Sequence, residues 1–440
     1  MSEEIQMMKL SNKTFYNRHV LELERFVYEK KSLHITNSKS KNKSNLNVSK
    51  TVFIEIDGSL DELKNIKLEK FDRILITDLV ENYKNLFNLL EVTEKMLTYD
   101  GKLILTSVNS KYLYLIKLIE FFKLKDSYSP SSYINPKKID RITKGAGFEY
   151  QKYYTKQIWP FKTFGVGTFF NSCLESIFTP FNLGIKTYMI FNSKNKPNQF
   201  KSKSIIIPAK NESGNLVELV ERIPKFENTE IIFSYGVSKD NTLEVMKNII
   251  KDNDNFTFKL VEQTKSGKAN AVWEALDVSS NDMIAILDAD ISVEPETLKD
   301  FFEIIEQNRS DFVNGTRLIY EMDENSMRFL NKIGNRFFQF FIGKIIKENL
   351  TDSLCGTKVF KKSFINDLIQ WQNLLSAKDP FGDFDLLFAA AYSGQKIVEL
   401  PIHYKERRYG STQISRFRDG LKLFSYLVTS FIFFNTSRNG

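Results

Sequence analysis

The hydrophobic pattern of the chain predicts blocks in which short apolar runs alternate with amphipathic stretches. In the first block, strands are expected at Thr51–Ile56, Arg73–Thr77 and Lys102–Ser107, and a helix at Tyr83–Leu97. Strands that alternate with helices are typical of a parallel sheet whose faces are covered by helices. Charged and apolar positions also alternate through residues 1–36, which we expect to be helical.

A second block follows a polar stretch at residues 193–202, where Pro197 favours a domain boundary. Apolar runs at Ser204–Ile207, Glu230–Ser234 and Lys259–Glu262 predict strands separated by helices. The chain is therefore expected to contain a second α/β domain. The predicted segments are a helical region with a basic linker (1–50), a first domain (51–192), a linker (193–202), a second domain (203–410) and an apolar C-terminal segment (411–440).

Composition adds limited information on partners. The 440 residues carry a net charge of +8, which suits an anionic partner, although a general bias toward Lys, Asn, Phe and Ile is an alternative explanation. The basic stretch at residues 37–50 is interpreted as a solvated linker, so no nucleic-acid partner is expected. Only Cys173 and Cys355 are present, which excludes a disulfide framework and favours a reducing, cytoplasmic setting. No signal peptide is apparent.

Residues 285–290, Ala-Ile-Leu-Asp-Ala-Asp, combine an apolar run with two carboxylates. The run predicts a buried strand, and the i, i+2 spacing places Asp288 and Asp290 on one face of an extended chain. Two carboxylates in this position suit Mg²⁺, which takes one or two carboxylates together with phosphate oxygens. The alternative is an aspartate-rich turn that caps the next helix.

Several basic residues stand where they could meet an anion. Lys268 follows a glycine at the start of a predicted helix, where a cation and backbone donors suit phosphate, although an exposed surface lysine would show the same pattern. Arg317 follows the predicted strand Phe312–Asn314, and Arg407 and Arg408 precede a Gly-Ser pair. Arginine side chains match phosphate oxygens well, but each taken singly could be an ordinary surface charge.

Between Lys203 and Arg418 the chain contains the motifs PAKNE, SKDNT, SGKANA, DAD, NGTR, FGDFD and KERRYGS in this order. This set resembles the family-two glycosyltransferases of GT-A fold, close to the polyprenyl-phosphate (dolichol-phosphate mannose synthase-like) branch. The resemblance implies an inverting glycosyltransferase of cell-envelope glycan biosynthesis, with a UDP- or GDP-sugar donor, a polyprenyl-phosphate or glycan acceptor, and Mg²⁺ or Mn²⁺. Tyr235-Gly236 stand where the family has paired aspartates, which leaves the preferred base open.

The resemblance also implies roles for single residues. Asp288 and Asp290 would bind the metal, and Asp383, Asp385 and Arg317 would act in catalysis. Either Asp383 or Asp385 is a candidate general base, although an ionised lipid phosphate would need none. The alternative for Asp383 is the N-cap of the helix that follows.

Substrate contacts are implied on both sides of the site. On the acceptor side Cys355 and Lys358, within DSLCGTKVF, are expected to line the site, and the alternative for Cys355 is a buried structural thiol. The implied substrate-binding residues are Pro208, Ala209, Glu212, Ser238, Asp240, Lys268, Asp288, Cys355, Lys358, Arg407, Arg408 and Ser411.

From Phe71 to about Phe191, the stretches FDRILITDLVENY, EKMLTYDGKLILTSVN, SYINPKKIDRITKGAGFEY and IWPF resemble the C-terminal half of a class I S-adenosylmethionine-dependent methyltransferase domain. Such domains hold the cofactor on a glycine-rich turn after the first strand. The corresponding stretch here is Thr51–Ser59, whose only glycine is Gly58, and no acidic ribose-binding strand follows it. We therefore expect a truncated Rossmann-like, methyltransferase-type domain without bound cofactor ahead of the GT-A domain.

Two apolar stretches predict peripheral contact with the inner face of the cell membrane. Residues 328–347 are expected to form an amphipathic helix, with a helix packed on the protein's own core as the alternative. The run Leu421–Phe434 is too short to span a bilayer and is expected to lie at the surface or to pack in a homo-oligomer. The predicted basic side of the first helix is Arg328, Lys332, Arg336 and Lys347, and its apolar side is Leu330, Ile333, Phe337, Phe341 and Ile345.

Two other functions remain open at this point. A membrane-associated scaffold or nucleotide-sugar sensor without turnover would explain the missing aspartates at Tyr235-Gly236. A bifunctional methyltransferase-glycosyltransferase would use the first domain as well. Intact DAD, Gly-Lys and RYGS segments favour turnover, because a dead site tends to lose several of them together.

Overall fold

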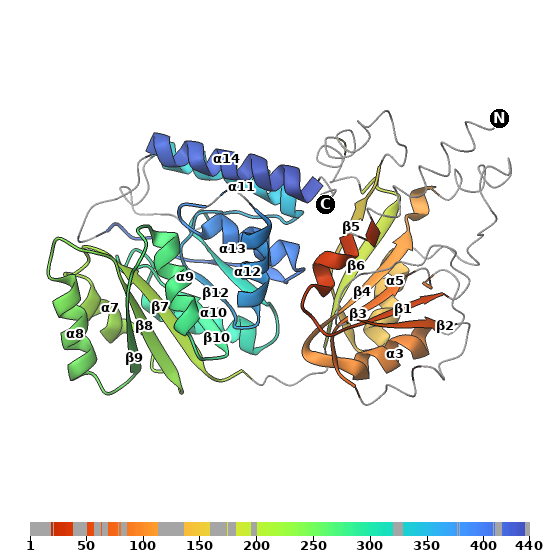
Figure 1. The fold of residues 1–440 in the computed structure, drawn as a ribbon, viewed down its shortest axis with the longest axis horizontal. Coiled ribbons are helices and arrows are strands. Elements are labelled where there is room, and N and C mark those ends of the chain that lie inside the picture. The colour runs from red at the N-terminus through yellow and green to blue at the C-terminus, as the bar shows by residue number, and fades with distance from the viewer. Residues whose placement is uncertain are drawn as a thin grey trace. The chain divides into compact units, whose positions relative to one another are not determined.

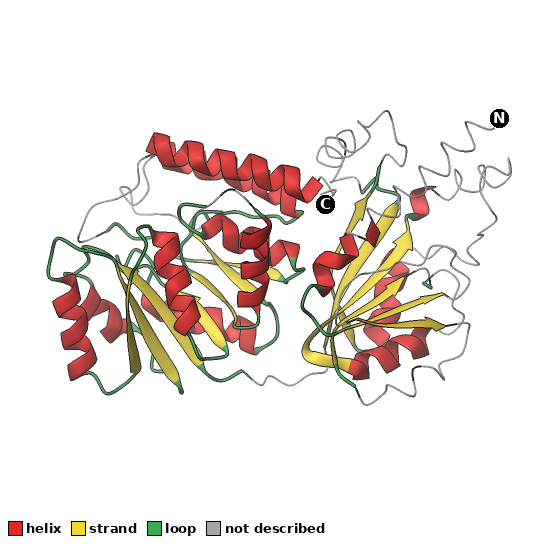
Figure 2. Ribbon diagram, in the orientation of Figure 1, coloured by secondary structure: helices red, strands yellow, loops and turns green. Residues whose placement is uncertain are grey.

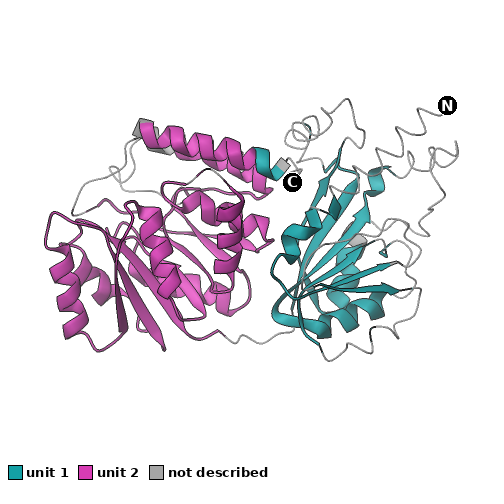
Figure 3. Cartoon of the chain, viewed as in Figure 1, with its two compact units in different colours: residues 1–197, 432–440 teal, residues 198–431 magenta. Residues whose placement is uncertain are grey.

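The chain folds into two compact units, residues Met1–Pro197 with Ile432–Gly440, and residues Asn198–Phe431 (Figure 3). The computed structural model describes residues 19–20, 22–37, 51–56, 63, 69–77, 79–80, 86–112, 136–158, 174, 182–194, 200–319, 329–375, 377, 379–407, 409 and 416–435.

The N-terminal unit is built on a six-stranded sheet with strand order β2-β1-β3-β4-β6-β5 (Figures 1 and 2). The first four strands of this order are parallel, whereas β6 runs antiparallel to both of its neighbours. Its elements are β1 (Ser32–Asn37), β2 (Thr51–Ile56), β3 (Phe71–Thr77), α3 (Leu86–Met96), β4 (Leu97–Val108), η1 (Ser110–Tyr112), α5 (Pro136–Gly145), β5 (Phe148–Lys156) and β6 (Lys186–Ser193).

β1 is a strand where the sequence pattern predicted a helix, so the sheet begins with β1 rather than with β2. Residues 19–20 and 22–27 are helical, as expected. In β1, Leu33 and Ile35 are fully buried in the core. His34 between them points to the other face, where its Nε2 lies 2.8 Å from Thr77 Oγ1. A central strand can therefore carry polar residues at alternate positions, because neighbouring strands supply their hydrogen bonds.

This extra strand changes the assignment of the predicted cofactor turn. β1 lies between β2 and β3, where the strand order reverses, and doubly wound sheets bind ligands at such a point. The sequence that links β1 to β2, residues 38–50, contains no glycine and lies outside the described residues. Glu55 is on the second strand, so an acidic residue does occur there. Gly58 and Ser59 lie outside the described residues.

The C-terminal unit is built on a seven-stranded sheet with strand order β13-β11-β12-β10-β7-β8-β9. All neighbouring strands are parallel except β12, which is antiparallel to both β10 and β11. Its elements are β7 (Lys203–Ala209), α7 (Leu216–Arg222), β8 (Thr229–Tyr235), α8 (Thr242–Asp252), β9 (Thr257–Glu262), α9 (Lys268–Val278), β10 (Met283–Ile286), η3 (Pro295–Thr297), α10 (Leu298–Glu306), β11 (Phe312–Thr316), α11 (Phe329–Ile346), β12 (Lys358–Lys361), α12 (Phe364–Leu374), α13 (Asp383–Tyr392), β13 (Ile397–Pro401) and α14 (Arg416–Asn435).

The central strands of this sheet are buried on both faces, which explains their continuous apolar runs. Ile205, Ile206 and Ile207 of β7 are all fully buried, although only alternate residues share a face. Since β7, β8 and β10 are parallel, their carboxyl ends meet at one edge of the sheet. That edge carries the PAKNE, SKDNT and DAD motifs.

Helices α11 and α14 lie side by side (Figures 1 and 2), and the ring centroids of Phe337 and Phe424 are 6.3 Å apart. α11 packs on the protein through Phe338, Ile342 and Ile346, which are almost fully buried. The apolar side that the sequence predicted does not pack on the core, because the buried positions are offset from it by one residue. Arg328 and the side chains of Leu330 and Lys332 lie outside the described residues.

The outer side of these two helices forms an exposed apolar surface, here called the α11–α14 patch. It mixes aromatic and aliphatic side chains and includes the exposed Arg336 and Lys422 beside them. Within the described ranges, the structure contains no helix that is long and apolar enough to cross a membrane. The exposed apolar members of the patch are Ile333, Phe337, Phe340, Phe341, Leu421, Phe424 and Val428.

Candidate active site

The carboxyl edge of the sheet brings four of the predicted site residues together as two ion pairs. Asp288 and Asp290 follow β10, and Lys268 is the first residue of α9. Lys268 Nζ lies 2.6 Å from Asp288 Oδ1, and Arg407 donates to Asp290 Oδ2 from Nη2 at 2.5 Å and from Nε at 3.1 Å. Burial alone would raise the pKa of Asp288, but the adjacent Lys268 outweighs it and holds the pKa below the usual value.

Asp290 also shapes the turn in which it lies. Its Oδ1 accepts hydrogen bonds from the backbone N–H of Ser292 at 3.0 Å and from the Ser292 hydroxyl at 2.6 Å. The next helical segment, η3, has Glu294 as its N-cap, so neither aspartate caps it. The capping alternative raised by the sequence is therefore wrong, although Asp290 does stabilise its own turn.

A short segment, Ser353–Thr357, crosses directly beside Asp288 and is here called the strap. A Cβ atom built on Gly356 would lie 2.2 Å from Asp288 Oδ2 and 2.6 Å from Lys268 Nζ. No side chain fits there, so the glycine allows backbone to touch the predicted metal carboxylate. Sequence reasoning did not single out Gly356, even though it lies inside the DSLCGTKVF stretch.

Glu212 stands close to the same charges. Its Oε2 accepts a hydrogen bond of 2.6 Å from Asn215 Nδ2, and its Oε1 lies 4.0 Å from Arg407 Nη1. Burial raises the pKa of Glu212 to about 7, against the opposing effects of Asn215 and Arg407. Arg407 thus bridges the end of β7 to the turn after β10.

The residues predicted to contact the nucleoside fix the loops at this edge. Pro208 and Ala209 are the last residues of β7 and pair in register with β8. Ser238 Oγ accepts a 3.0 Å hydrogen bond from the Asn211 N–H. Asp240 accepts hydrogen bonds from the N–H groups and hydroxyls of residues 213 and 242. These hydrogen bonds outweigh burial and lower the pKa of Asp240, so both side chains hold the loops after β7 and β8 together.

Tyr409, within KERRYGS, packs on the loop after β7. A Cβ atom on Gly214 would lie 2.7 Å from its ring, and its hydroxyl is 3.3 Å from Ser213 Oγ. The sequence signal for this contact was the motif itself, from which only basic and serine residues were chosen. Arg408 and Ser411 lie outside the described residues, and their predicted contacts stay predictions.

On the predicted acceptor side, Asp383 is the first residue of α13 and pairs with the fully buried Lys358 at 2.9 Å. Lys358 also donates to the Cys355 carbonyl. The N-cap of α13 is Gly382, with a φ of 85°. The capping carboxylate is Asp379, which accepts the N–H groups of residues 381, 384 and 385. The N-cap alternative for Asp383 is therefore wrong, and Asp379 was missed by sequence reasoning.

Asp385 is buried and faces helices α12 and α14. Its Oδ1 accepts a hydrogen bond from the Tyr426 hydroxyl, and its Oδ2 accepts a 3.3 Å hydrogen bond from Gln372 Nε2. The Tyr426 oxygen in turn accepts a 2.8 Å hydrogen bond from Trp371 Nε1. Burial and then repulsion from Asp379 raise the pKa of Asp385 well above the usual aspartate value. Asp385 is therefore engaged by residues of α12 and α14, whereas Asp383 pairs with Lys358 beside the strap.

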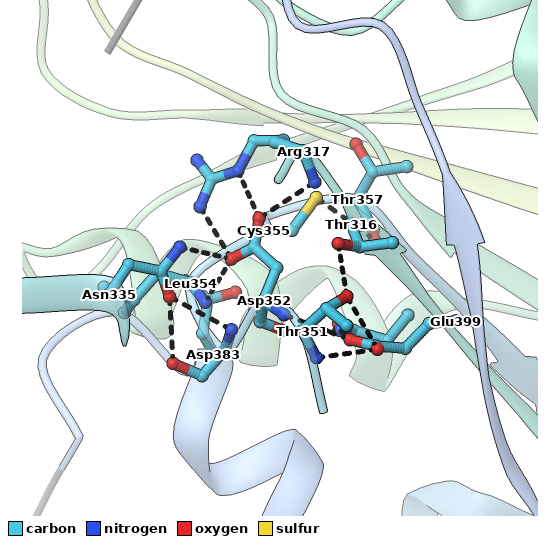
Figure 4. Close-up of polar contacts among 12 residues, drawn as sticks. Thr316, Arg317, Asn335, Thr351, Asp352, Leu354, Cys355, Thr357, Asp383 and Glu399 are labelled. Atoms are coloured by element: carbon cyan, nitrogen blue, oxygen red, sulfur yellow. Dashed lines mark hydrogen bonds and ion pairs between the residues drawn. The ribbon is translucent and has the colours of Figure 1, made fainter. Parts of the chain in front are cut away.

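Arg317 forms a two-pronged ion pair with Asp352 (Figure 4). The Nε–Oδ2 and Nη2–Oδ1 distances are 2.7 Å and 2.9 Å, and the guanidinium lies 5.0 Å from the centre of the Tyr404 ring. Burial alone would raise the pKa of Asp352, but Arg317 and hydrogen bonds lower it to about 2. Asp352 precedes the strap and was not among the predicted site residues.

Cys355 is fully buried within the strap. A Cβ atom on Gly315 would lie 2.7 Å from its sulfur, so the thiol is packed against the end of β11. Burial raises the pKa of Cys355 to about 12, which keeps the thiol protonated. This environment fits the structural-thiol alternative rather than a substrate contact.

The site has the chemistry for a metal that is completed by substrate. Among the described residues, no cluster of three or more His, Cys, Asp or Glu side chains could hold an ion by itself. Asp288 is 29% exposed and pairs with a single lysine, whereas Asp290 is already bonded to Ser292 and Arg407. Mg²⁺ commonly takes one or two carboxylates and fills its other positions with phosphate oxygens and water, so this donor set fits it.

Part of the chain that carries this site is similar to known proteins. Residues 204–369 match the family described as Glycosyl transferase family 2. Undecaprenyl-phosphate 4-deoxy-4-formamido-L-arabinose transferase of Proteus mirabilis is 22% identical over 48% of this chain and 62% of that relative. Dolichol-phosphate mannosyltransferase of Pyrococcus furiosus is 26% identical over 51% of this chain and 61% of that relative. The chain thus spans about three fifths of the length of these relatives.

Among solved structures, glucosyl-3-phosphoglycerate synthase from Mycobacterium tuberculosis, in complex with Mn²⁺, UDP and glucosyl-3-phosphoglycerate, is 15% identical with a TM-score of 0.38. That match covers 53% of this chain and 79% of the other. The matched region contains the Lys268–Asp288 pair, Asp290 and the strap, whereas Arg407 and Asp383 lie beyond its end. Residues 204–369 of this chain form a glycosyl transferase family 2 domain.

Proposed function

We propose that the chain is an inverting glycosyltransferase that moves a sugar from a nucleotide-diphosphate donor to a polyprenyl-phosphate or glycan acceptor. The observation that carries this proposal is the pair of ion pairs at the carboxyl edge of the sheet, Lys268–Asp288 and Arg407–Asp290. Two cations and two carboxylates at the end of parallel strands can meet both a diphosphate and its counter-ion. The names of the relatives, which include transferases for undecaprenyl phosphate and dolichol phosphate, support the acceptor class.

A divalent ion such as Mg²⁺ or Mn²⁺ would be held by Asp288, with Asp290 beside it, and would supply charge for the leaving diphosphate. Lys268 would turn from Asp288 toward a phosphate oxygen, since it begins α9, where helix N–H groups also face the anion. Arg407 would keep the 290 turn and Glu212 in place next to the nucleoside. Most of the rate enhancement would come from this positioning and from electrostatic stabilisation of the leaving group.

The acceptor would approach from the side of Asp383. Lys358 orients this carboxylate, which could accept a proton from a sugar hydroxyl, whereas an ionised lipid phosphate needs no base. The α11–α14 patch supports a lipid acceptor, because both helices pack on α13. Phe338 of α11 and Tyr426 of α14 each contact Phe384, with ring centroids 5.3 Å and 6.4 Å apart. We propose that this patch rests on the surface of the cell membrane, at its inner face.

The N-terminal unit is proposed to be a shortened methyltransferase-type domain that does not bind S-adenosylmethionine. Its parallel strands follow the 2-1-3-4 order of a doubly wound sheet, which supports the fold class. The stretch after its first strand has no glycine, so the close backbone approach that such a cofactor needs has no suitable residue. Glu55 on the second strand supplies an acidic side chain, but it does not replace the missing glycine.

The test is transfer from a panel of UDP- and GDP-sugars to a polyprenyl phosphate, with Mn²⁺ and with a chelator. Transfer that requires the metal and is lost in Asp288→Asn is expected. A chain that binds a donor in calorimetry but transfers nothing to any acceptor would instead act as a sensor. Transfer that is unchanged by both chelator and Asp288→Asn would contradict the proposed mechanism.

A further inference from the structure

Asp352 is held from both sides at the start of the strap (Figure 4). Its backbone N–H donates to Glu399 Oε1 at 3.2 Å, and its carbonyl accepts a 2.7 Å hydrogen bond from Asn314 Nδ2. Glu399 also binds the N–H and hydroxyl of Thr351. The backbone at Asp352 is thus fixed to β11 and β13, while the strap continues from it toward Asp288.

The side chain of Asp352 joins elements that are far apart in the sequence. It accepts hydrogen bonds from Arg317 at the end of β11, from the Leu354 N–H in the strap at 3.0 Å, and from Asn335 Nδ2 of α11 at 2.7 Å. Asn335 Oδ1 also accepts the N–H and hydroxyl of Ser353, each at 3.2 Å. The Asn335 side chain therefore hydrogen-bonds both to Asp352, the partner of Arg317, and to the strap.

Asn335 lies on the inner side of a helix whose outer side is exposed. It is only 1% exposed, whereas Ile333 and Phe337, two residues away on either side, are 49% and 41% exposed. A displacement of α11 at its apolar surface must move Asn335 with it, because both belong to the same helix turn. The hydrogen bonds of Asn335 then carry that displacement to Arg317 and to the strap beside Asp288.

We propose that Asn335 is a positioning residue that couples the α11–α14 patch to the active site through Asp352. The inference rests on the proposed glycosyltransferase function and adds a residue to it. Seating of the patch on a lipid surface would fix α11, and Asn335 would then hold Arg317 and Gly356 in their working positions. Asn335 would act by positioning. Within the part of the chain that the structure describes, none of its hydrogen bonds reaches Lys268 or Asp288.

The experiment compares the full-length chain with Asn335→Ala and Asn335→Asp, and with Gln339→Ala as the matched control. Gln339 lies one turn further along α11 and donates a 2.6 Å hydrogen bond to the Leu350 carbonyl, not to Asp352. Three measurements are made on each protein: donor affinity by calorimetry, transfer to a polyprenyl phosphate in vesicles, and hydrogen exchange of the amides of residues 352–357.

Asn335→Ala is expected to lower the transfer rate about tenfold or more while donor affinity stays within about twofold, because misplacement of about 1 Å can cost about a hundredfold. Exchange in residues 352–357 should accelerate in this variant, and Gln339→Ala should match the wild type in all three measurements. In Asn335→Asp, the new carboxyl faces Asp352 and Arg317, so transfer relative to wild type should recover as pH falls and the added group becomes a donor again.

Two results would overturn the inference. The first is wild-type transfer and wild-type exchange at residues 352–357 in Asn335→Ala. The second is an equal effect in Gln339→Ala, which would show a general loss of helix packing. If the wild type itself transfers nothing, the proposed function fails, but the exchange measurement still decides whether Asn335 holds the strap. If Asn335→Ala does not fold, Asn335→Asp provides the same comparison across pH.

Discussion

Replacing Gly356 with alanine tests how much the reaction depends on the contact between the strap and Asp288. The added Cβ would lie 2.2 Å from Asp288 Oδ2, where ordinary contact begins at 3.4 Å, so the carboxylate or the strap must move by about 1 Å. The nearest atoms are the ends of the Asp288 and Lys268 side chains, which can swing away without unfolding the sheet. The Lys268–Asp288 ion pair should therefore be disrupted while the fold is kept.

The magnitude follows from this displacement. A misplacement of about 1 Å costs about a hundredfold in rate, which corresponds to about 2.7 kcal/mol of transition-state stabilisation. We expect kcat/KM for sugar transfer to fall by about that factor, with a thermal midpoint close to wild type. Gly420→Ala is the matched control, because a Cβ at Gly420 on α14 meets nothing within 4 Å. Full activity in Gly356→Ala, at unchanged stability, would refute the argument that the strap sets the position of Asp288.

Three further predictions concern other parts of the chain. Folding raises the pKa of Glu212 from about 4.5 to about 7. Between these pH values the folded state keeps a proton that the unfolded state has lost. The free energy of unfolding should therefore fall as pH rises from 4.5 to 7, by at most about 3 kcal/mol. Glu212→Gln should remove this slope in thermal unfolding at pH 5 and pH 8, and parallel curves for the two proteins would contradict the assignment. Flotation with anionic vesicles at low salt should be weakened by Phe340→Asp combined with Phe424→Asp, and equal flotation of both proteins would exclude the α11–α14 patch as the contact. Calorimetric titration of the full chain with S-adenosylmethionine should show no binding, and micromolar affinity would revive a bifunctional enzyme.

The parallel strands and the charged groups at their ends were predictable from the sequence because each depends on local pattern. A continuous apolar run such as Ile205–Ile207 indicates a buried strand by itself. The spacing of the two aspartates that follow β10 predicts an anion or metal site, and the structure brings both of them into ion pairs at this edge. The motif order in this region predicted the family that residues 204–369 match.

The missed features depend on partners that are distant in the sequence. β1 was predicted as helix from the alternation of charged and apolar residues, whereas its polar His34 bonds to Thr77 of a neighbouring strand, which the sequence pattern does not reveal. Asp352 opens the DSLCGTKVF stretch but was not chosen, and neither its pairing with Arg317 nor its hydrogen bond from Asn335 can be read from local pattern. The buried positions of α11 are offset by one residue from the apolar side that the sequence predicted. Packing against α13, rather than periodicity, decides which side of the helix is covered.

The short strand β12 divides the larger sheet into an early and a late part. β7, β8, β9 and β10 come from residues 203–286 and are joined by parallel crossovers of short sequence separation. β11 and β13 reach them only through β12, within the described sheet, and β12 follows α11 in the chain. Since contacts of short sequence separation form first, the half that carries the DAD segment is expected to become ordered during synthesis before α11 and the strap are complete. Val359 in β12, which pairs with Ala285 on one side and Val313 on the other, would then join the two halves in the last step of folding.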